Sequence, residues 1–361
     1  MPIRHESDAY FQELAVTKQR TLVVGGAGAI GHYVARLLVD TGHNVIVSSR
    51  NGDRASTAAR QIPGASPAVI DTANAQLELP ADVNLVIDCT GTSQTVIAEA
   101  TAVAAADLID ISATTTHLLA LAGLDQIFVN AGSRAITGVG LAPGLSTLLA
   151  RAVHDTEYLE PITINGILDT RDEHGEGSAA FTMGKVGTDF ADPTTGAMIR
   201  NFTGLRRPNL PAGFGKLLVA RADFPDQYTL TNALGVPVTT NYGFTSTATT
   251  LIIAAATRIP RAGKLLDRIA QKTPRPTGTG PWLITAETTQ RTAWATGTGQ
   301  AIGTAAMTQL AAAHLAVGKL KPGVHSIDQL MELDDQTLAG LAHHGIAVAV
   351  NRYRHHRELS K

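Results

Sequence analysis

Short apolar runs and segments of helical period alternate along the first 50 residues. Residues 21–24 form an apolar, β-branched run that predicts a buried strand. The apolar residues that follow, Val34, Leu37 and Leu38, recur at helical spacing, and residues 44–48 form a second strand-like run. The pattern therefore predicts a strand, a turn, a helix and a second strand, in that order.

The turn between the first strand and the helix is rich in glycine. Gly26, Gly28 and Gly31 have the spacing G-x-G-x-x-G. In a unit of this order, the first glycine permits the tight turn, the second lets the backbone approach a pyrophosphate, and the third lets helix and strand pack closely. Free N–H groups at the helix N-terminus can bind the anion. The motif predicts a dinucleotide-binding βαβ unit whose cofactor contacts are Gly26, Gly28, Ala29, Ile30 and Gly31.

The end of the second strand indicates which dinucleotide is bound. An acidic residue at this point would bind the ribose 2′-hydroxyl of NAD, but the chain has Ser48, Ser49 and Arg50 there. The planar guanidinium of Arg50 suits a 2′-phosphate, and the two serines can add hydrogen bonds. We therefore expect NADP(H) as the cofactor. The alternative is that Arg50 is a solvated loop residue.

Two further apolar strands are predicted at residues 84–87 and 108–111, and small polar residues follow each of them. In an open parallel sheet, the carboxyl ends of the strands border the ligand crevice. The residues expected there are Thr90, Gly91 and Ser112 for the cofactor, and Thr114 and His117 for the substrate. Alternatively, the small polar residues are ordinary turn residues and His117 caps a helix.

Residues 135–147 predict another strand, a sharp Pro-Gly turn and a helix start. We expect Pro143 and Gly144 to mark the crossing into a second domain and to border the substrate. Beyond this turn, β-branched and aromatic content predicts an α+β arrangement. Its strands are expected at residues 162–168, 217–220, 238–244, 282–286 and 292–296, and helices at 247–258, 263–270, 299–317, 326–333 and 336–344. The predicted division is a Rossmann domain at 1–145, an inserted domain at 146–297, and C-terminal helices at 298–361 that return to the first domain.

Composition narrows the function classes. The 361-residue chain exceeds the about 250–300 residues at which a single core stops growing, so two domains are expected. Its formal charge of −2, with no basic run in the body of the chain, argues against a nucleic-acid partner. A single cysteine, Cys89, excludes an internal disulfide framework and suits a reducing cytoplasm. We expect no signal peptide, membrane span or metal site, and a homodimer that binds a small-molecule substrate.

Several segments together resemble the saccharopine dehydrogenase-like oxidoreductases. They are the glycine turn at residues 25–31, the strand end at 108–112, the Gly-Leu-Ala-Pro-Gly-Leu-Ser run at 140–146, the late helix with Thr304-Ala305, and the segments 223–230 and 234–237. The resemblance implies an N-terminal doubly wound Rossmann domain of α/β class, an inserted second domain, and a substrate held between the domains beside the nicotinamide. It also implies reduction of an imine or the reverse oxidation of a secondary amine.

Two second-domain side chains are candidates for proton transfer. His174 lies in an acidic cluster after a predicted strand, and its intrinsic pKa near ~6.5 suits proton donation. Tyr228 could orient the substrate through its phenol. The alternative for both is a solvated loop position.

Three functions stay open at this point. The first is an NADP(H)-dependent oxidoreductase of saccharopine dehydrogenase-like type that reduces an imine or oxidises a secondary amine. The second is a reductase of a carbonyl or activated alkene. The third is a non-catalytic NADP-binding sensor, which the glycine motif alone also permits.

Overall fold

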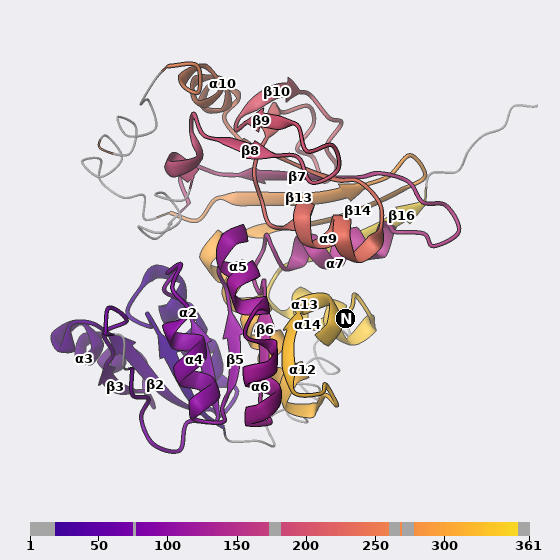
Figure 1. The fold of residues 1–361 in the computed structure, drawn as a ribbon. Coiled ribbons are helices and arrows are strands. Elements are labelled where there is room, and N and C mark those ends of the chain that lie inside the picture. Colours follow the sequence, from indigo (N-terminus) through magenta and orange to yellow (C-terminus); the bar gives the residue numbers. More distant parts are fainter. Residues whose placement is uncertain (1–18, 75–76, 173–181, 260–267, 269–277, 353–361) are drawn as a thin grey trace, which may run out of the picture.

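The computed structural model describes residues 19–74, 77–172, 182–259, 268 and 278–352. These residues form two large sheets, one above the other, with helices between and around them (Figure 1). The predicted α/β class with a Rossmann-type first sheet and a second, mixed sheet is confirmed.

The first sheet has seven strands, all parallel, in the order β15-β6-β5-β4-β1-β2-β3. From β1 the chain adds β2 and β3 on one side of the sheet and then β4, β5 and β6 on the other side. The order of the strands therefore reverses between β1 and β4, as in doubly wound folds. Four of the five residues of β1 are buried, because helices cover both faces of a parallel sheet. The strands are β1 (Arg20–Val24), β2 (Asn44–Ser49), β3 (Ser66–Val69), β4 (Leu85–Asp88), β5 (Asp107–Asp110), β6 (Arg134–Thr137) and β15 (Gly323–Ser326).

Helices pack on the two faces of this sheet through separate cores. On one face, Val34 and Leu38 of one helix share a core with Leu310. On the other face, Ile97 and Phe128 share a second core. The first group is α2 (Ala29–Asp40), α3 (Gly52–Gln61) and α12 (Gln300–Val317), and the second is α4 (Val96–Val103), α5 (Thr115–Ala122) and α6 (Asp125–Ala131).

The second sheet also has seven strands, in the order β10-β11-β12-β7-β13-β14-β16. β12 and β7 pair in parallel, and the other neighbours pair antiparallel. The strands are β7 (Ile162–Leu168), β10 (Thr203–Arg206), β11 (Val219–Arg221), β12 (Val238–Phe244), β13 (Pro281–Glu287), β14 (Arg291–Thr298) and β16 (Ala347–Arg352). A separate ribbon pairs β8 (Asp189–Ala191) with β9 (Met198–Arg200).

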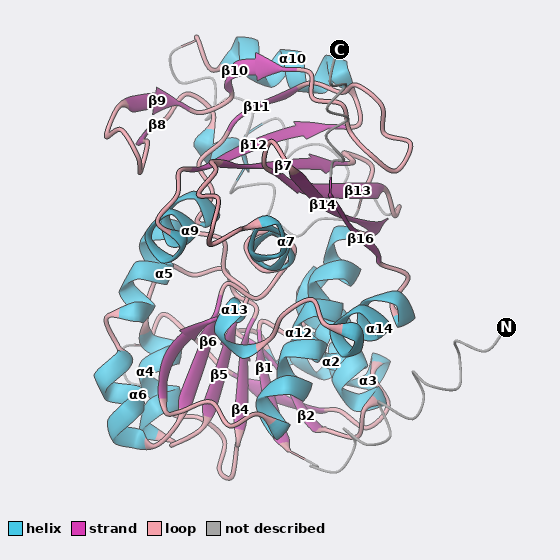
Figure 2. Ribbon diagram, turned by 90° about the vertical axis from the view of Figure 1, so that its right-hand side faces the viewer, coloured by secondary structure: helices cyan, strands magenta, loops and turns pink. Residues whose placement is uncertain are grey.

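Helices α7 (Leu145–Val153) and α9 (Asp226–Leu234) lie between the two sheets (Figure 2). One continuous core contains Val23 of the first sheet, Leu148 of α7, and Ile164 and Trp282 of the second sheet. The domains are therefore joined by buried apolar contacts as well as by the chain. The remaining helices are α10 (Thr247–Ala256), α13 (Ile327–Leu330) and α14 (Asp335–His343).

The predicted elements agree with the structure where the apolar pattern is long. Strands at 162–168 and 238–244 have the predicted bounds. The predicted capping of Ser326 by Gln329 is present, although this helix ends at Leu330 because Met331 is extended. The expected helix at 263–270 lies outside the described residues apart from 268. Strands β15 and β16 were not expected in the C-terminal segment, and they add one strand to each sheet.

Candidate functional site

The glycine turn after β1 has the geometry that an anion site requires. Gly25 has a φ of +76°, and a Cβ on Gly31 would lie 2.4 Å from the carbonyl oxygen of Gly25. A side chain at Gly31 would therefore push the helix away from the turn. Gly28 is the N-cap of α2, and no side chain caps the helix there. The first N–H groups of α2, from Ala29 and Ile30, are thus available to a pyrophosphate.

The end of β2 places its three candidate residues in different surroundings. Ser48 is buried, and its Oγ donates to the carbonyl of Val23 at 3.3 Å, so it stabilises the sheet. The Oγ of Ser49 accepts from the N–H of Asn51 at 3.3 Å and is partly exposed. Arg50 is exposed, and Arg54 follows it in the first turn of α3. Two exposed guanidinium groups therefore lie where the ribose phosphate is expected.

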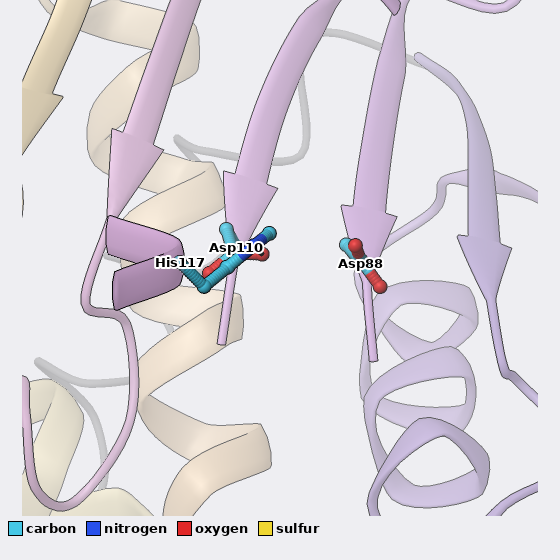
Figure 3. Close-up of side chains that lie close together, drawn as sticks. All are labelled: Asp88, Asp110 and His117. Atoms are coloured by element: carbon cyan, nitrogen blue, oxygen red, sulfur yellow. Dashed lines mark hydrogen bonds and ion pairs between the residues drawn. The ribbon is translucent and has the colours of Figure 1, made fainter. Parts of the chain in front are cut away.

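Two carboxylates and an imidazole gather at the carboxyl ends of β4 and β5 (Figure 3). Asp88 and Asp110 are the last residues of these strands and pair with each other in the parallel register. His117, in the first turn of α5, places its Nε2 3.2 Å from Asp110 Oδ2. One ligand-type atom from each residue lies within 4.8 Å of the others, and all three residues are buried.

Each carboxylate in this strand-end cluster also binds the segment that follows its own strand. Asp88 Oδ1 accepts from the N–H of Thr90 at 2.8 Å and from its hydroxyl at 2.7 Å. Asp110 accepts from the N–H of Ser112 at 2.9 Å and from its hydroxyl at 3.1 Å. Thr90 and Ser112, which were predicted to line the cofactor, therefore fix the two acids.

Burial and mutual charge shift the pKa values in the strand-end cluster. Burial raises the pKa of Asp88 to about 7 and the charge of Asp110 adds to this, while the hydrogen bonds of Thr90 and the charge of His117 oppose it. Burial alone would lower the pKa of His117, but its hydrogen bond to Asp110 and the charges of Asp110 and Asp88 raise it. Burial also raises the pKa of the Cys89 thiol, which packs against the apolar core.

The other two strand-end predictions lie around this cluster. Gly91 is exposed with a φ of +65°, and Thr114 is the partly exposed N-cap of α5. The sequence reasoning missed Asp88 and Asp110 themselves. A signal was present, because Asp88 directly follows the predicted strand at 84–87 and Asp110 lies near the end of the one at 108–111, and parallel strands bring their carboxyl ends together.

The Pro-Gly turn lies beside this edge of the sheet. The Ala142–Pro143 peptide bond is cis, and both Pro143 and Gly144 are buried. Gly144 has a φ of +130°, and a Cβ on it would lie 2.0 Å from the carbonyl oxygen of Gly140, so the turn needs glycine. A Cβ on Gly138 would lie 3.4 Å from Pro143 Cβ and 3.7 Å from Leu118 Cδ2, which places the turn next to α5.

Of the two proton donors expected in the second domain, only Tyr228 lies among the described residues. His174 lies outside the described residues. The hydroxyl of Tyr228 donates to the carbonyl of Ala191 at 2.9 Å, and burial together with Asp223 raises the pKa of Tyr228 to about 12. The phenol must break this hydrogen bond before it can donate its proton to a substrate.

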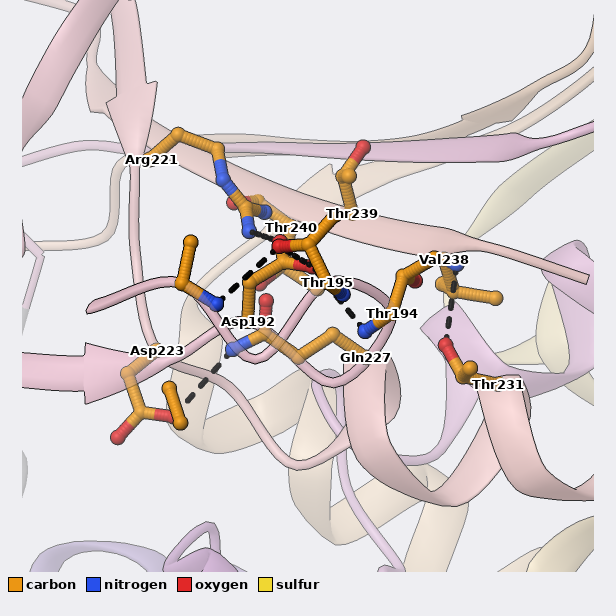
Figure 4. A network of polar contacts seen from close by, with 12 residues as sticks. Asp192, Thr194, Thr195, Arg221, Asp223, Gln227, Thr231, Val238, Thr239 and Thr240 are labelled. Atoms are coloured by element: carbon orange, nitrogen blue, oxygen red, sulfur yellow. Dashed lines mark hydrogen bonds and ion pairs between the residues drawn. The ribbon is translucent and has the colours of Figure 1, made fainter. Parts of the chain in front are cut away.

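Around Tyr228, the second domain carries a polar network that ties β8, β11, β12 and α9 together (Figure 4). Arg221 donates to Asp192 Oδ2 at 2.8 Å and to the carbonyl of Thr240 at 3.2 Å. Gln227 Nε2 donates to Asp223 Oδ1 at 3.3 Å. These contacts stabilise the packing of α9 and the segment after β8 against β11 and β12.

Comparisons with known proteins place the first domain in a broad class. Residues 9–115 match the model of the shikimate / quinate 5-dehydrogenase family, a match that includes β1 to β5 and stops at the start of α5. No curated protein matches the chain.

Solved structures with similarity include the Pseudomonas aeruginosa RhlG/NADP active-site complex, at 17% identity over 40% of this chain and 79% of that chain with a TM-score of 0.29. Serine dehydrogenase from Escherichia coli has 15% identity over 35% of this chain and 86% of that chain, with a TM-score of 0.30. An oxidoreductase of the short-chain dehydrogenase/reductase family from Burkholderia thailandensis has 12% identity over 34% of this chain and 67% of that chain, with a TM-score of 0.27. Likeness at this level carries no information on substrate or reaction.

The glycine turn, the sheet order and the family match together define an NAD(P)-binding domain of the oxidoreductase type. The saccharopine dehydrogenase-like subtype is not confirmed by these comparisons. Within the part of the chain that the structure describes, no helix is long and apolar enough to cross a membrane.

Proposed function

We propose that the protein is an NADP(H)-dependent oxidoreductase that reduces an imine, or oxidises a secondary amine, of a small metabolite held between the two domains. The observation that carries the proposal is the uncapped N-terminus of α2 beside the glycine turn. Gly31 lets α2 pack against the turn, and Gly28 carries no side chain where a pyrophosphate would approach. When bound at this turn, NADP(H) supplies or accepts the hydride.

The preference for NADP(H) is supported by the cations that follow β2. Arg50 and Arg54 are both exposed, and Ser49 keeps a partly exposed hydroxyl beside them. A guanidinium donates two parallel N–H groups to a phosphate, and such charge-assisted bonds contribute on the order of 1.5–3 kcal/mol. Ser48 is withdrawn from this proposal because its hydroxyl binds the sheet.

The imine chemistry is supported by the resemblance of the Pro-Gly run and the late helix, together with the acidic groups near the turn. An ionised carboxylate beside the substrate would stabilise a cationic iminium and disfavour an anionic substrate. We do not assign the strand-end cluster to substrate contact, because its carboxylates already accept hydrogen bonds from Thr90, Ser112 and His117. We assign it the role of fixing the segments after β4 and β5, which border the crevice.

The test is a titration of NADPH and NADH against the wild type and Arg50→Ala. We expect NADPH to bind at least about tenfold more tightly than NADH, and the substitution to remove most of this difference. Arg60→Ala is the matched control, because Arg60 is an exposed arginine at the other end of α3. Equal affinities in the wild type contradict the NADP(H) assignment.

The same preparation then decides the reaction class. NADPH is mixed with a panel of aldehydes and keto compounds, with and without a primary amine. Oxidation of NADPH that requires both components is the expected result for imine reduction. Oxidation with the carbonyl compound alone supports the carbonyl reductase instead, and tight NADPH binding without any turnover across the panel supports the sensor.

A further inference from the structure

Another buried acid, outside the strand-end cluster, lies where α7 meets α9. Asp226 begins α9 and is 1% exposed. Its Oδ1 accepts from the hydroxyl of Ser146 at 2.8 Å and from that of Thr147 at 2.9 Å. Both donors belong to the first turn of α7, directly after Pro143 and Gly144. Asp226 is therefore fixed to the turn at which the two domains join.

The other oxygen of this carboxyl group has no such support. Asp226 Oδ2 is buried and has no hydrogen-bond partner among the residues that the structure describes. The hydroxyl of Tyr242 is also buried and has no partner within the same described residues. A buried polar atom without a partner costs about 1–3 kcal/mol, and a charged one costs more. Two such atoms beside one domain junction are therefore available to a partner that the described residues do not supply.

The ring of Tyr242 is held rigidly. It stacks on Phe224 with ring centroids 3.9 Å apart and 13° between the planes. It also lies over Gly166, where a Cβ would come within 2.2 Å of the ring. Phe224 lies two residues before Asp226 in the chain, so this stacking places the Tyr242 ring beside the start of α9. Burial, together with the charge of Asp226, raises the pKa of Tyr242. Ala142, the residue before Pro143, packs against the same apolar cluster as Tyr242.

We propose that Asp226 and Tyr242 form the binding site for the nitrogen of a cationic amine or iminium substrate. The proposal rests on the proposed function and names the substrate class of that site. The free carboxylate oxygen of Asp226 accepts one N–H of the cation, and the phenol oxygen of Tyr242 accepts a second. A protonated nitrogen is the partner that satisfies both atoms and offsets the buried charge. A carboxylate or phosphate at this position would face Asp226 with like charge.

The charge of Asp226 should make binding depend on pH. Burial raises the pKa of Asp226 to about 6, the hydroxyls of Ser146 and Thr147 oppose this shift, and the charge of Asp328 adds to it. The titratable and charged groups around Asp226 are Tyr242 from β12 and Asp328 from α13, and Asp328 is paired with Arg151 of α7. Above pH 6 the carboxylate is ionised and can pair with an amine cation. Below it, the affinity for the cation should fall about tenfold for each pH unit.

The experiment uses the full chain saturated with NADP⁺ and calorimetric titration. The probes are amine hydrochlorides from methylamine to phenethylamine, primary and secondary, each paired with the neutral alcohol of the same shape. We expect at least one amine to bind tenfold or more tightly than its alcohol, and Asp226→Asn to remove this preference. Asp40→Asn is the matched control, since Asp40 is exposed at the far end of α2. Tyr242→Phe, a second variant that keeps the ring, should weaken amines about threefold to tenfold.

The outcomes separate this proposal from the broader one. If every amine binds no better than its alcohol, or if Asp226→Asn keeps the preference for amines, the nitrogen site is wrong. Affinity for NADPH is measured on each variant and should stay at the wild-type value. Absence of NADPH binding in the wild type overturns the proposed function, whereas intact NADPH binding without an amine preference overturns the nitrogen site alone.

Discussion

Among the buried acids that the structure describes, those of the strand-end cluster and Asp226 differ in how their oxygen atoms are satisfied. In the strand-end cluster, Asp88 and Asp110 accept hydrogen bonds from the backbone and side chains of Thr90 and Ser112, and His117 adds a further partner. At the α7–α9 contact, one oxygen of Asp226 has two donors and the other has none among the described residues.

This difference indicates which of the acids we expect to bind a ligand. A carboxylate whose partners all come from its own chain lowers the free energy of the folded state by those bonds, and a ligand gains little by competing for it. A carboxylate with one free, buried oxygen has already lost its water and has not regained a partner. The first arrangement favours stability and the second favours binding.

The largest expected effect comes from breaking the strand-end cluster. Asp110→Ala removes the acceptor of three donors, the N–H and hydroxyl of Ser112 and the Nε2 of His117. Removal of one member of a buried pair costs about 3–5 kcal/mol. We expect a loss of this size in the free energy of unfolding, measured by urea denaturation. Asp40→Ala, at an exposed position, should change it by less than about 0.5 kcal/mol. A similarly small loss for Asp110→Ala contradicts the assigned role.

The pH dependence of the free energy of unfolding tests the same cluster without removing any of its side chains. The folded pKa of Asp88 is raised from 3.8 to about 7, so its contribution to stability is fully present below pH 3.8 and is lost as the pH rises towards 7. The raised pKa of His117 has the same sign in a higher window, above pH 6.5. The free energy of unfolding should fall by up to about 1.4 kcal/mol per pH unit in the lower window.

Two variants separate these contributions. Asp88→Asn should flatten the lower window and also narrow the upper one, because the charge of Asp88 helps to raise the pKa of His117. His117→Gln should flatten the upper window and widen the lower one, because the charge of His117 lowers the pKa of Asp88. Thermal unfolding at half-unit steps from pH 4 to 8.5 provides the measurement, with each variant compared against the wild type. The quantity to follow is the free energy of unfolding of the wild type minus that of Asp88→Asn. If this difference rises between pH 4 and 7, the pKa of Asp88 is not raised.

Sequence reasoning reached the Rossmann sheet because its signals are local. Buried parallel strands are continuous apolar runs, and the glycine spacing fixes the turn. It also placed Pro143 and Gly144 at the domain junction. It could not find Asp226 or Tyr242, because the partners of Asp226 lie 79 and 80 residues away in the chain and no spacing announces them. Likewise, β15 has only four residues, two of them polar, and β16 ends in two polar residues, and each strand pairs with the edge of a sheet formed by earlier segments.

The smallest expected effect is also the most specific for the unsatisfied pair. Tyr242→Phe removes a hydroxyl that has no partner among the described residues, so the free energy of unfolding should stay within about 0.5 kcal/mol of the wild type or rise. Thr240→Val is the matched comparison on the same strand, because Thr240 Oγ1 donates to the carbonyl of Ala222 at 2.5 Å. Its loss leaves a buried acceptor unpaired and should cost about 1–3 kcal/mol. Urea denaturation of both variants measures the contrast. If Tyr242→Phe costs as much as Thr240→Val, the phenol has a partner inside the folded chain, and it is then a structural group like those of the strand-end cluster.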